Sequence, residues 1–149
     1  MNVRPATIDD REAWCEMRTS LWPDTDDCHR SEIDEYFAGK SIDIVETFIC
    51  EVDSEVVGFL EMNIRNFAEG SRSARVPYVE AWYVRPEFQG RGYGRVLMRR
   101  AEAWARERGF DELASDTEIE NTRSIEMHKH LGFEETDRVV CFLKRLGDA

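Results

Sequence analysis

The chain has 149 residues with a formal net charge of −11, and 42% of its residues are hydrophobic. This length suits one domain with one hydrophobic core, so a single domain over residues 1–149 is expected. The acidic balance argues against nucleic-acid binding, and no apolar run is long enough to cross a membrane.

The four cysteines lie far apart and include no Cys-x-x-Cys pair. This spacing argues against both a metal site and a disulfide framework. The N-terminus also lacks the pattern of a signal peptide. A cytoplasmic protein with reduced thiols is therefore expected, with Cys15, Cys50 and Cys141 in the core.

The first quarter of the chain predicts a strand followed by two helices. Strand character covers Asn2–Ala6, and Thr7 with Asp10 forms a capping box for the first helix. That helix is expected to end where Trp22 precedes a proline. An acidic loop at 24–27 then leads to a second helix.

The second helix is predicted over Cys28–Ala38, with a glycine after it as its stop signal. Two strands, Thr47–Val52 and Val56–Ile64, are separated by the two-residue turn Asp53-Ser54, so they predict a hairpin. A polar loop over residues 65–75 follows.

The second half of the chain continues with strands and two amphipathic helices. The expected elements are a strand at Val76–Val84, a helix at Gly92–Arg108, a strand at Glu112–Thr117, a helix at Thr122–Leu131, and final strands at Phe133–Asp137 and Val139–Lys144. The order predicts an α+β fold.

Residues 84–94 read Val-Arg-Pro-Glu-Phe-Gln-Gly-Arg-Gly-Tyr-Gly and connect a strand to a helix. Such a turn directs backbone N–H groups at one spot beside the positive end of the helix, which favours an anion such as a pyrophosphate. No Gly-Lys-Ser/Thr follows, so the turn is not a P-loop, and the glycine spacing does not match the dinucleotide fingerprint. Residues 85–100 carry five arginines and one glutamate, a net charge of +4, whereas the rest of the chain carries −15.

The pattern Gln89-x-x-Gly92-x-Gly94 after a strand resembles the acyl-CoA loop of the GNAT superfamily of N-acetyltransferases. The downstream segment also resembles a GNAT signature: Asn121, a small residue three positions later, a helix, and then Gly132-Phe133. The resemblance implies a mixed, mostly antiparallel sheet flanked by about four helices. It also implies that the sheet splays between the strands ending at Val84 and starting near Glu112, with acetyl-CoA as cosubstrate and no metal. The implied contacts to acetyl-CoA are Tyr83, Val84, Gln89, Gly90, Arg91, Gly92, Tyr93, Gly94, Arg95, Asn121 and Ser124.

By the same resemblance, the backbone N–H near Val84 polarises the thioester carbonyl. His128 stands where many relatives have a tyrosine that protonates the departing thiolate. A histidine can act as this general acid, but it can equally be a half-buried helix residue while water supplies the proton. Asn121 is open to two roles, because it can also be the N-cap of the following helix.

The acceptor-side segments resemble the aminoglycoside 6′-N-acetyltransferases. They are Leu-Trp-Pro at 21–23, Tyr-Val-Glu-Ala-Trp-Tyr-Val at 78–84, Ala-Ser-Asp-Thr at 114–117 and Leu-Gly-Phe-Glu-Glu-Thr-Asp at 131–137. Several carboxylates and an aromatic face suit a polycationic sugar. The resemblance places four residues in the acceptor site: Trp22, Glu80, Asp116 and Asp137, the last where a glutamate is common.

The expected reaction is direct acetyl transfer from acetyl-CoA to the 6′-amine of an aminoglycoside in a ternary complex, which confers resistance. Glu80 and Asp116 are expected to position and desolvate the amine, with Glu80 as a possible proton relay through water. Two alternatives stay open: another amine acceptor, such as a polyamine, an amino acid or a protein N-terminus, or a module that binds acetyl-CoA without catalysis. The apolar C-terminal strands predict a homodimer.

Overall fold

The computed structural model describes residues 1–147, and for residues 25–28 it describes the backbone only. The chain forms two compact units, Met1–Asp116 and Thr117–Ala149, and each is described by itself. The elements of the first unit are β1 (Asn2–Pro5), α1 (Arg11–Leu21), α2 (Asp26–Phe37), β2 (Glu46–Val52), β3 (Glu55–Arg65), β4 (Val76–Val84), α3 (Tyr93–Glu107) and β5 (Ala114–Ser115). The second unit contains α4 (Thr122–His130).

The five strands form one sheet in the order β1-β2-β3-β4-β5. The first four strands are antiparallel neighbours, whereas β5 runs parallel to β4. The predicted hairpin between β2 and β3 is confirmed. Asp53 and Ser54 have φ angles of +51° and +66°, as in the two-residue turns that match the twist of paired strands. The mixed sheet with α-helices on it confirms the predicted α+β class.

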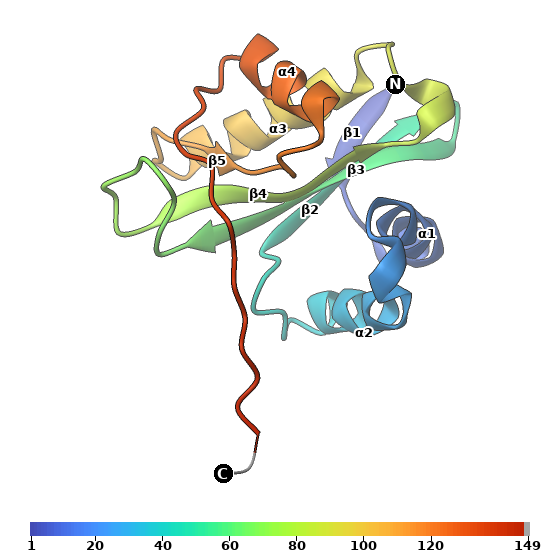
Figure 1. Ribbon diagram of the computed structural model, residues 1–149. Helices are drawn as coiled ribbons and strands as arrows, with labels where there is room; N and C mark the ends of the chain where they lie inside the picture. Colours follow the sequence, from blue (N-terminus) through green and yellow to red (C-terminus); the bar gives the residue numbers. More distant parts are fainter. Residues whose placement is uncertain (148–149) are drawn as a thin grey trace. The chain divides into compact units, whose positions relative to one another are not determined.

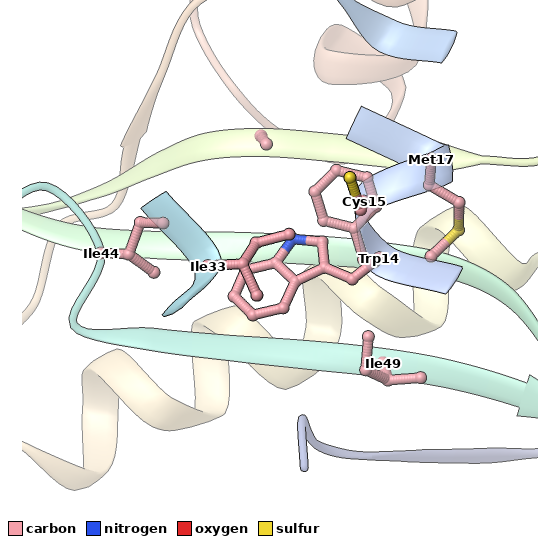
Figure 2. Packing of buried hydrophobic residues seen from close by; sticks show 8 residues of the cluster. Trp14, Cys15, Met17, Ile33, Ile44 and Ile49 are labelled. Atoms are coloured by element: carbon pink, nitrogen blue, oxygen red, sulfur yellow. The ribbon is translucent and has the colours of Figure 1, made fainter. Parts of the chain in front are cut away.

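Helices α1 and α2 cover one face of the sheet, and α3 covers the other (Figure 1). Figure 2 shows the cluster beneath α1 and α2, in which Trp14, Met17, Ile33 and Ile49 are completely buried. The ring of Trp14 also packs edge-on against Tyr36, with the two ring centroids 5.4 Å apart. Helices on both faces explain why β2 and β3 are apolar over most of their length.

The start of α1 is fixed by a group of charged residues as well as by its cap. The Asp10 carboxylate accepts hydrogen bonds from the Thr7 N–H at 2.7 Å and from the Arg4 guanidinium at 2.7 and 2.9 Å. Burial acts to raise the pKa of Asp10, but the hydrogen bonds from Arg4 and Thr7 outweigh it and lower this pKa. The predicted capping box is therefore confirmed, although a 3-10 turn at Ile8–Asp10 precedes the α-helix.

Several boundaries differ from the predictions. The acidic loop expected at 24–27 is instead a 3-10 turn at Pro23–Thr25 and the first residues of α2. A further 3-10 turn at Pro86–Phe88 was not predicted. Strand β5 comprises Ala114–Ser115 only, rather than Glu112–Thr117.

The final strands predicted at Phe133–Asp137 and Val139–Lys144 are absent from the described residues 133–147. A strand needs a neighbour for its hydrogen bonds, and sequence alternation alone does not supply one. From residue 139 onward the apolar residues of this segment are exposed, from 57% for Val139 to 91% for Phe142. Cys141, predicted in the core, is exposed as well, whereas Cys15 and Cys50 are buried as expected.

Helix α4 has clear signals at both ends. The Asn121 side chain accepts a hydrogen bond from the Ser124 N–H at 3.1 Å, so Asn121 is the N-cap. Gly132, with φ +97°, follows the last turn. A left-handed residue after a helix is the usual stop, and glycine adopts it without strain.

Candidate active site

Strand β4 is paired on one side along its length but on the other side only near its start. Its partners on β5 are limited to two pairs, Tyr78 with Ala114 and Val79 with Ser115. From Glu80 to Val84 this edge faces no other described strand. Backbone groups along such an edge are available to an extended ligand that carries amides. The predicted splay of the sheet at this position is confirmed.

A β-bulge lies at the point where β4 and β5 separate. Glu61 of β3 is opposite Ala81, but the next β3 residue, Met62, is opposite Val79, so Glu80 is the additional residue of β4. A bulge changes the direction of a strand and redirects side chains, and bulges are frequent next to active sites. The sequence predicted a regular strand here and gave no signal for the bulge.

The Glu80 carboxylate is held by two residues of β3. Arg65 donates from Nε to Oε2 at 2.7 Å and from Nη2 to Oε1 at 2.6 Å, which is a bidentate ion pair. The Asn63 amide donates to Oε2 at 3.1 Å. Glu80 therefore does not face solvent as a free anion, and sequence reasoning missed both of its partners.

Asp116, the second predicted acceptor carboxylate, is bound to the same group of residues through Tyr78. The Tyr78 hydroxyl donates to Asp116 Oδ2 at 2.7 Å, and the Arg65 guanidinium carbon lies 3.6 Å from the centroid of the Tyr78 ring. Burial first, and then the bond to Asp116, raise the pKa of Tyr78. The structure thus brings Glu80 and Asp116 together around Arg65 and Tyr78.

The glycine-rich loop ends in an α3 N-terminus that no side chain caps. Gly92 is the N-cap with φ +88°, Gly90 has φ +80°, and the first turn of α3 contains no acidic residue. The first N–H groups of a helix have no acceptor within the helix, and they carry its positive partial charge. With the exposed Arg91 and Arg95 beside it, this end of α3 fits a pyrophosphate.

Two side-chain hydrogen bonds also join the glycine-rich loop and the start of α3 to the end of β4. Gln89 donates from its amide to the Val84 carbonyl at 2.9 Å, and Trp82 donates from Nε1 to the Gly94 carbonyl at 2.9 Å. A Cβ on Gly94 would lie 3.5 Å from the Trp82 ring. These contacts fix the loop to the end of β4, so Gln89 has a structural partner besides the cofactor contact that the motif implies.

Trp22 lies just past α1, and its ring is partly buried against the core beneath the helices. The Arg18 guanidinium carbon lies 5.1 Å from the centroid of this ring. Arg18 in turn forms ion pairs with Glu32 at 2.6 Å and with Glu61 at 3.0 Å. The buried, ion-paired guanidinium of Arg18 therefore packs against the ring of Trp22.

Glu61 is the buried acid of this group, and sequence reasoning did not single it out. It is 1% exposed and accepts a hydrogen bond from Trp14 Nε1 at 2.8 Å. Burial raises the pKa of Glu61 to about 7, although Arg18 and Trp14 favour its charged form. A charged residue inside the apolar run Val-Val-Gly-Phe-Leu-Glu-Met was the signal that could have identified it.

The predicted site residues Asn121, Ser124, His128 and Asp137 belong to the second unit. His128 Nδ1 lies 2.8 Å from the Ser124 carbonyl oxygen, and its ring packs edge-on against Phe133 at 5.2 Å. In the tautomer with a proton on Nδ1, this nitrogen donates to the Ser124 carbonyl. Asp137 is exposed and accepts a bond from the Arg138 N–H at 2.8 Å.

Two kinds of feature are absent from the part of the chain that the structure describes. No helix there is long and apolar enough to cross a bilayer. Among the same residues, no group of three or more His, Cys, Asp or Glu side chains is arranged to hold a metal ion.

The open β4 edge and the uncapped α3 N-terminus are features of an acyl-CoA-binding fold, and comparison with known proteins agrees. The profile of the acetyltransferase (GNAT) family matches residues 11–133, so the chain belongs to the GNAT acetyltransferases. It is 42% identical over 146 residues to an aminoglycoside N(6′)-acetyltransferase type 1 of Klebsiella aerogenes, which covers 97% of this chain and 96% of that protein. A protein of the same name from Stenotrophomonas maltophilia is 40% identical over 141 residues, with 94% and 90% covered.

Solved structures give the same result. The chain matches the apo aminoglycoside 6′-N-acetyltransferase of Acinetobacter haemolyticus with a TM-score of 0.88 at 33% identity, covering 99% of this chain and 100% of that one. It matches AAC(6′)-Iy, in complex with the bisubstrate analogue CoA-S-monomethyl-acetylneamine, with a TM-score of 0.87 at 35% identity, covering 97% and 98%. The resemblance inferred from the two sequence motifs is confirmed.

Proposed function

We propose that this protein transfers the acetyl group of acetyl-CoA to the 6′-amine of aminoglycoside antibiotics and thereby confers resistance. The observation that carries the proposal is the similarity to two aminoglycoside N(6′)-acetyltransferases over at least 94% of the chain. The family profile extends from the first unit into the second, which supports a single acetyltransferase domain over residues 1–149.

Acetyl-CoA supplies an activated thioester, and the described residues fit it at two places. The uncapped start of α3, with its left-handed glycines and exposed arginines, suits the pyrophosphate. The unpaired edge of β4 suits the amide-containing pantetheine arm. The residues that we assign to these contacts are Tyr83, Val84, Gln89, Gly90, Arg91, Gly92, Tyr93, Gly94, Arg95, Asn121 and Ser124.

We assign the acceptor to Glu80, Asp116, Trp22 and Asp137. Glu80 and Asp116 belong to one hydrogen-bonded group at the place where β4 leaves β5, next to the edge assigned to the thioester arm. The net charge of −15 outside residues 85–100 attracts a polycationic acceptor over a longer range. Trp22 offers an apolar face for a sugar ring.

The neutral amine nitrogen attacks the thioester carbonyl carbon, and the carbon–sulfur bond breaks. The nitrogen releases one proton as the amide forms, and the thiolate takes up a proton. The backbone N–H of Val84 is assigned to polarise the carbonyl. His128 is the candidate proton donor to the thiolate. The attack is direct, so a trapped acetyl-cysteine in a mass spectrum would contradict it.

We propose further that the chain is a homodimer and acts in the cytoplasm. The C-terminal segment presents Val139, Val140, Phe142 and Leu143 with 57% to 91% of each side chain exposed, which is the composition of a strand that lacks its partner. Pairing of this segment with a second copy would cover these side chains. The free thiols of Cys15 and Cys50 agree with a reducing compartment.

The function is tested by measuring free-thiol release from acetyl-CoA with a small panel of amines. Aminoglycosides with a 6′-amine are compared with close analogues that carry a 6′-hydroxyl, and spermidine serves as an unrelated polyamine. Turnover limited to the 6′-amine compounds is the expected result, and it establishes the reaction and the position together.

Turnover with spermidine alone would keep the chemistry and overturn the acceptor. Binding of acetyl-CoA without turnover of any panel member would contradict the proposed acceptor and favour a different amine, or a module without catalysis. Light scattering tests the dimer, since a monomeric mass would contradict it.

A further inference from the structure

The acceptor-site carboxylate Glu80 already has a cation bound to it. Arg65 contacts both oxygens of Glu80, at 2.6 and 2.7 Å, while Asn63 donates a third hydrogen bond at 3.1 Å. Three of the roughly four lone-pair positions of the carboxylate are then occupied, and the remaining one lies on Oε1. The Arg65–Glu80 pair as a whole carries no net charge.

This neutralisation matters because only a neutral amine has the lone pair that attacks the thioester. An unpaired carboxylate beside the acceptor nitrogen would raise the pKa of the amine and stabilise the unreactive ammonium form. A neighbouring cation has the opposite effect, because like charges disfavour protonation. The hydrogen bond that orients the amine needs only one free lone pair, and Oε1 retains it.

We propose that Arg65 is a positioning residue that neutralises Glu80, so that Glu80 orients the acceptor amine by a hydrogen bond without holding it as an ammonium ion. This inference rests on the proposed N-acetylation of aminoglycosides. The ammonium ion loses its proton to solvent before attack. The carbonyl carbon then gains the nitrogen and loses the sulfur. The nitrogen releases its second proton to solvent as the amide forms, and the thiolate takes up a proton.

The other charged groups around Arg65 are consistent with this role. The guanidinium stacks on Tyr78, whose hydroxyl is bonded to Asp116, so Arg65 also fixes the second carboxylate. The bidentate bond to Glu80 holds the pKa of Arg65 above its usual value although burial opposes this, so Arg65 stays protonated across the working pH range. Glu61 of β3 also interacts electrostatically with Glu80, but Glu61 itself forms an ion pair with Arg18 and accepts a hydrogen bond from Trp14.

The test compares two substitutions that change the local charge in opposite directions. Arg65→Gln leaves Glu80 anionic. We expect a KM for the aminoglycoside that falls about threefold to tenfold and a lower kcat at pH 7. The pH at half-maximal kcat should rise by about one pH unit. Glu80→Gln leaves Arg65 cationic, so the KM should rise and the pH at half-maximal kcat should fall.

Two controls separate charge from structure. Arg65→Lys keeps the cation and is expected to restore the wild-type pH profile, although it loses the bidentate geometry. Arg11→Gln removes a similar bidentate pair, with Asp34 at 2.6 and 2.8 Å, from the start of α1 and should leave the kinetics unchanged. The KM for acetyl-CoA and the thermal unfolding midpoint are measured for every variant.

The inference is overturned if Arg65→Gln raises the acceptor KM and lowers kcat equally at every pH, because that is the pattern of a merely structural residue. It is also overturned if Arg65→Gln and Glu80→Gln move the pH profile in the same direction. Wild-type turnover of the 6′-amine compounds in the same experiment would leave the proposed function standing in both cases. A wild-type protein that acetylates none of them would overturn the function and this inference together.

Discussion

Glu61 carries a carboxyl group inside the hydrophobic core. Its substitution by glutamine tests how much ionisation of this carboxyl lowers the free energy of unfolding. It is 1% exposed on β3, bonded to Trp14 Nε1 at 2.8 Å and paired with Arg18 at 3.0 Å. Burial raises its pKa from 4.5 to about 7 despite these two partners. Glutamine has the size and polarity of the protonated acid but cannot ionise, so Glu61→Gln isolates the contribution of the charge.

The sign follows from proton binding in the two states. Between pH 4.5 and about 7 the folded protein holds a proton that the unfolded chain has released, so wild-type stability falls as pH rises through this interval. At 1.36 kcal/mol for each pH unit, the loss amounts to about 3 kcal/mol. The free energy of unfolding of Glu61→Gln, relative to wild type, should therefore rise by about 3 kcal/mol between pH 5 and pH 8.

Urea unfolding at pH 5, 6, 7 and 8, at one fixed protein concentration, measures this difference. Glu35→Gln removes an exposed carboxyl group from α2 and is the matched control, for which the difference from wild type should stay nearly constant. A difference for Glu61→Gln that changes by less than about 1 kcal/mol over this range would refute the reasoning. It would mean that Arg18 and Trp14 compensate fully for the burial of the charge.

Three further substitutions test the region between β4 and α3 and the end of the reaction. Gly58→Ala places a Cβ 2.7 Å from the Tyr83 carbonyl oxygen, so we expect a loss of about 1–3 kcal/mol in urea unfolding, together with reduced kcat as the end of β4 moves. An unchanged urea midpoint would contradict this. Gly92→Ala puts an L-residue at φ +88°, which costs about 1–2 kcal/mol, and the KM for acetyl-CoA should rise while the acceptor KM does not. Equal rises in both would point to general unfolding. His128→Phe keeps the ring but removes the proton donor, so kcat should fall roughly tenfold or more while both KM values hold. An unchanged kcat would assign the proton to water.

Local signals accounted for the elements that were predicted correctly. The capping box at Thr7, the turn at Asp53-Ser54 and the stop at Gly132 all act within a few residues, and so does the glycine-rich entrance to α3. Two short motifs, the glycine-rich loop that starts at Gln89 and the segment that starts at Asn121, were enough to indicate the family. In these stretches the backbone conformation depends on neighbouring residues, which the sequence displays directly.

Long-range pairing was where the predictions failed. Strand β5 is two residues long because β4 diverges from it after Val79, and no residue of the 112–117 segment signals that divergence. The C-terminal segment 133–147 has strand-like composition, yet it is not a strand in the described chain. Whether alternating apolar residues form a strand depends on a neighbour that the alternation itself does not specify.

For the candidate site, the sequence likewise identified individual residues but not the residues they pair with. The positions of Glu80, Asp116, Trp22 and the glycine loop could be named from motifs, but their partners could not. Arg65 meets Glu80 from 15 residues away, and Glu61 meets Trp14 from 47 residues away, because β3, β4 and α1 converge in space. The sequence therefore determined which groups are present and how each short segment folds. Only the packing of strands and helices against one another decided which charges are neutralised, since electrostatic interactions depend on distance in space and on burial.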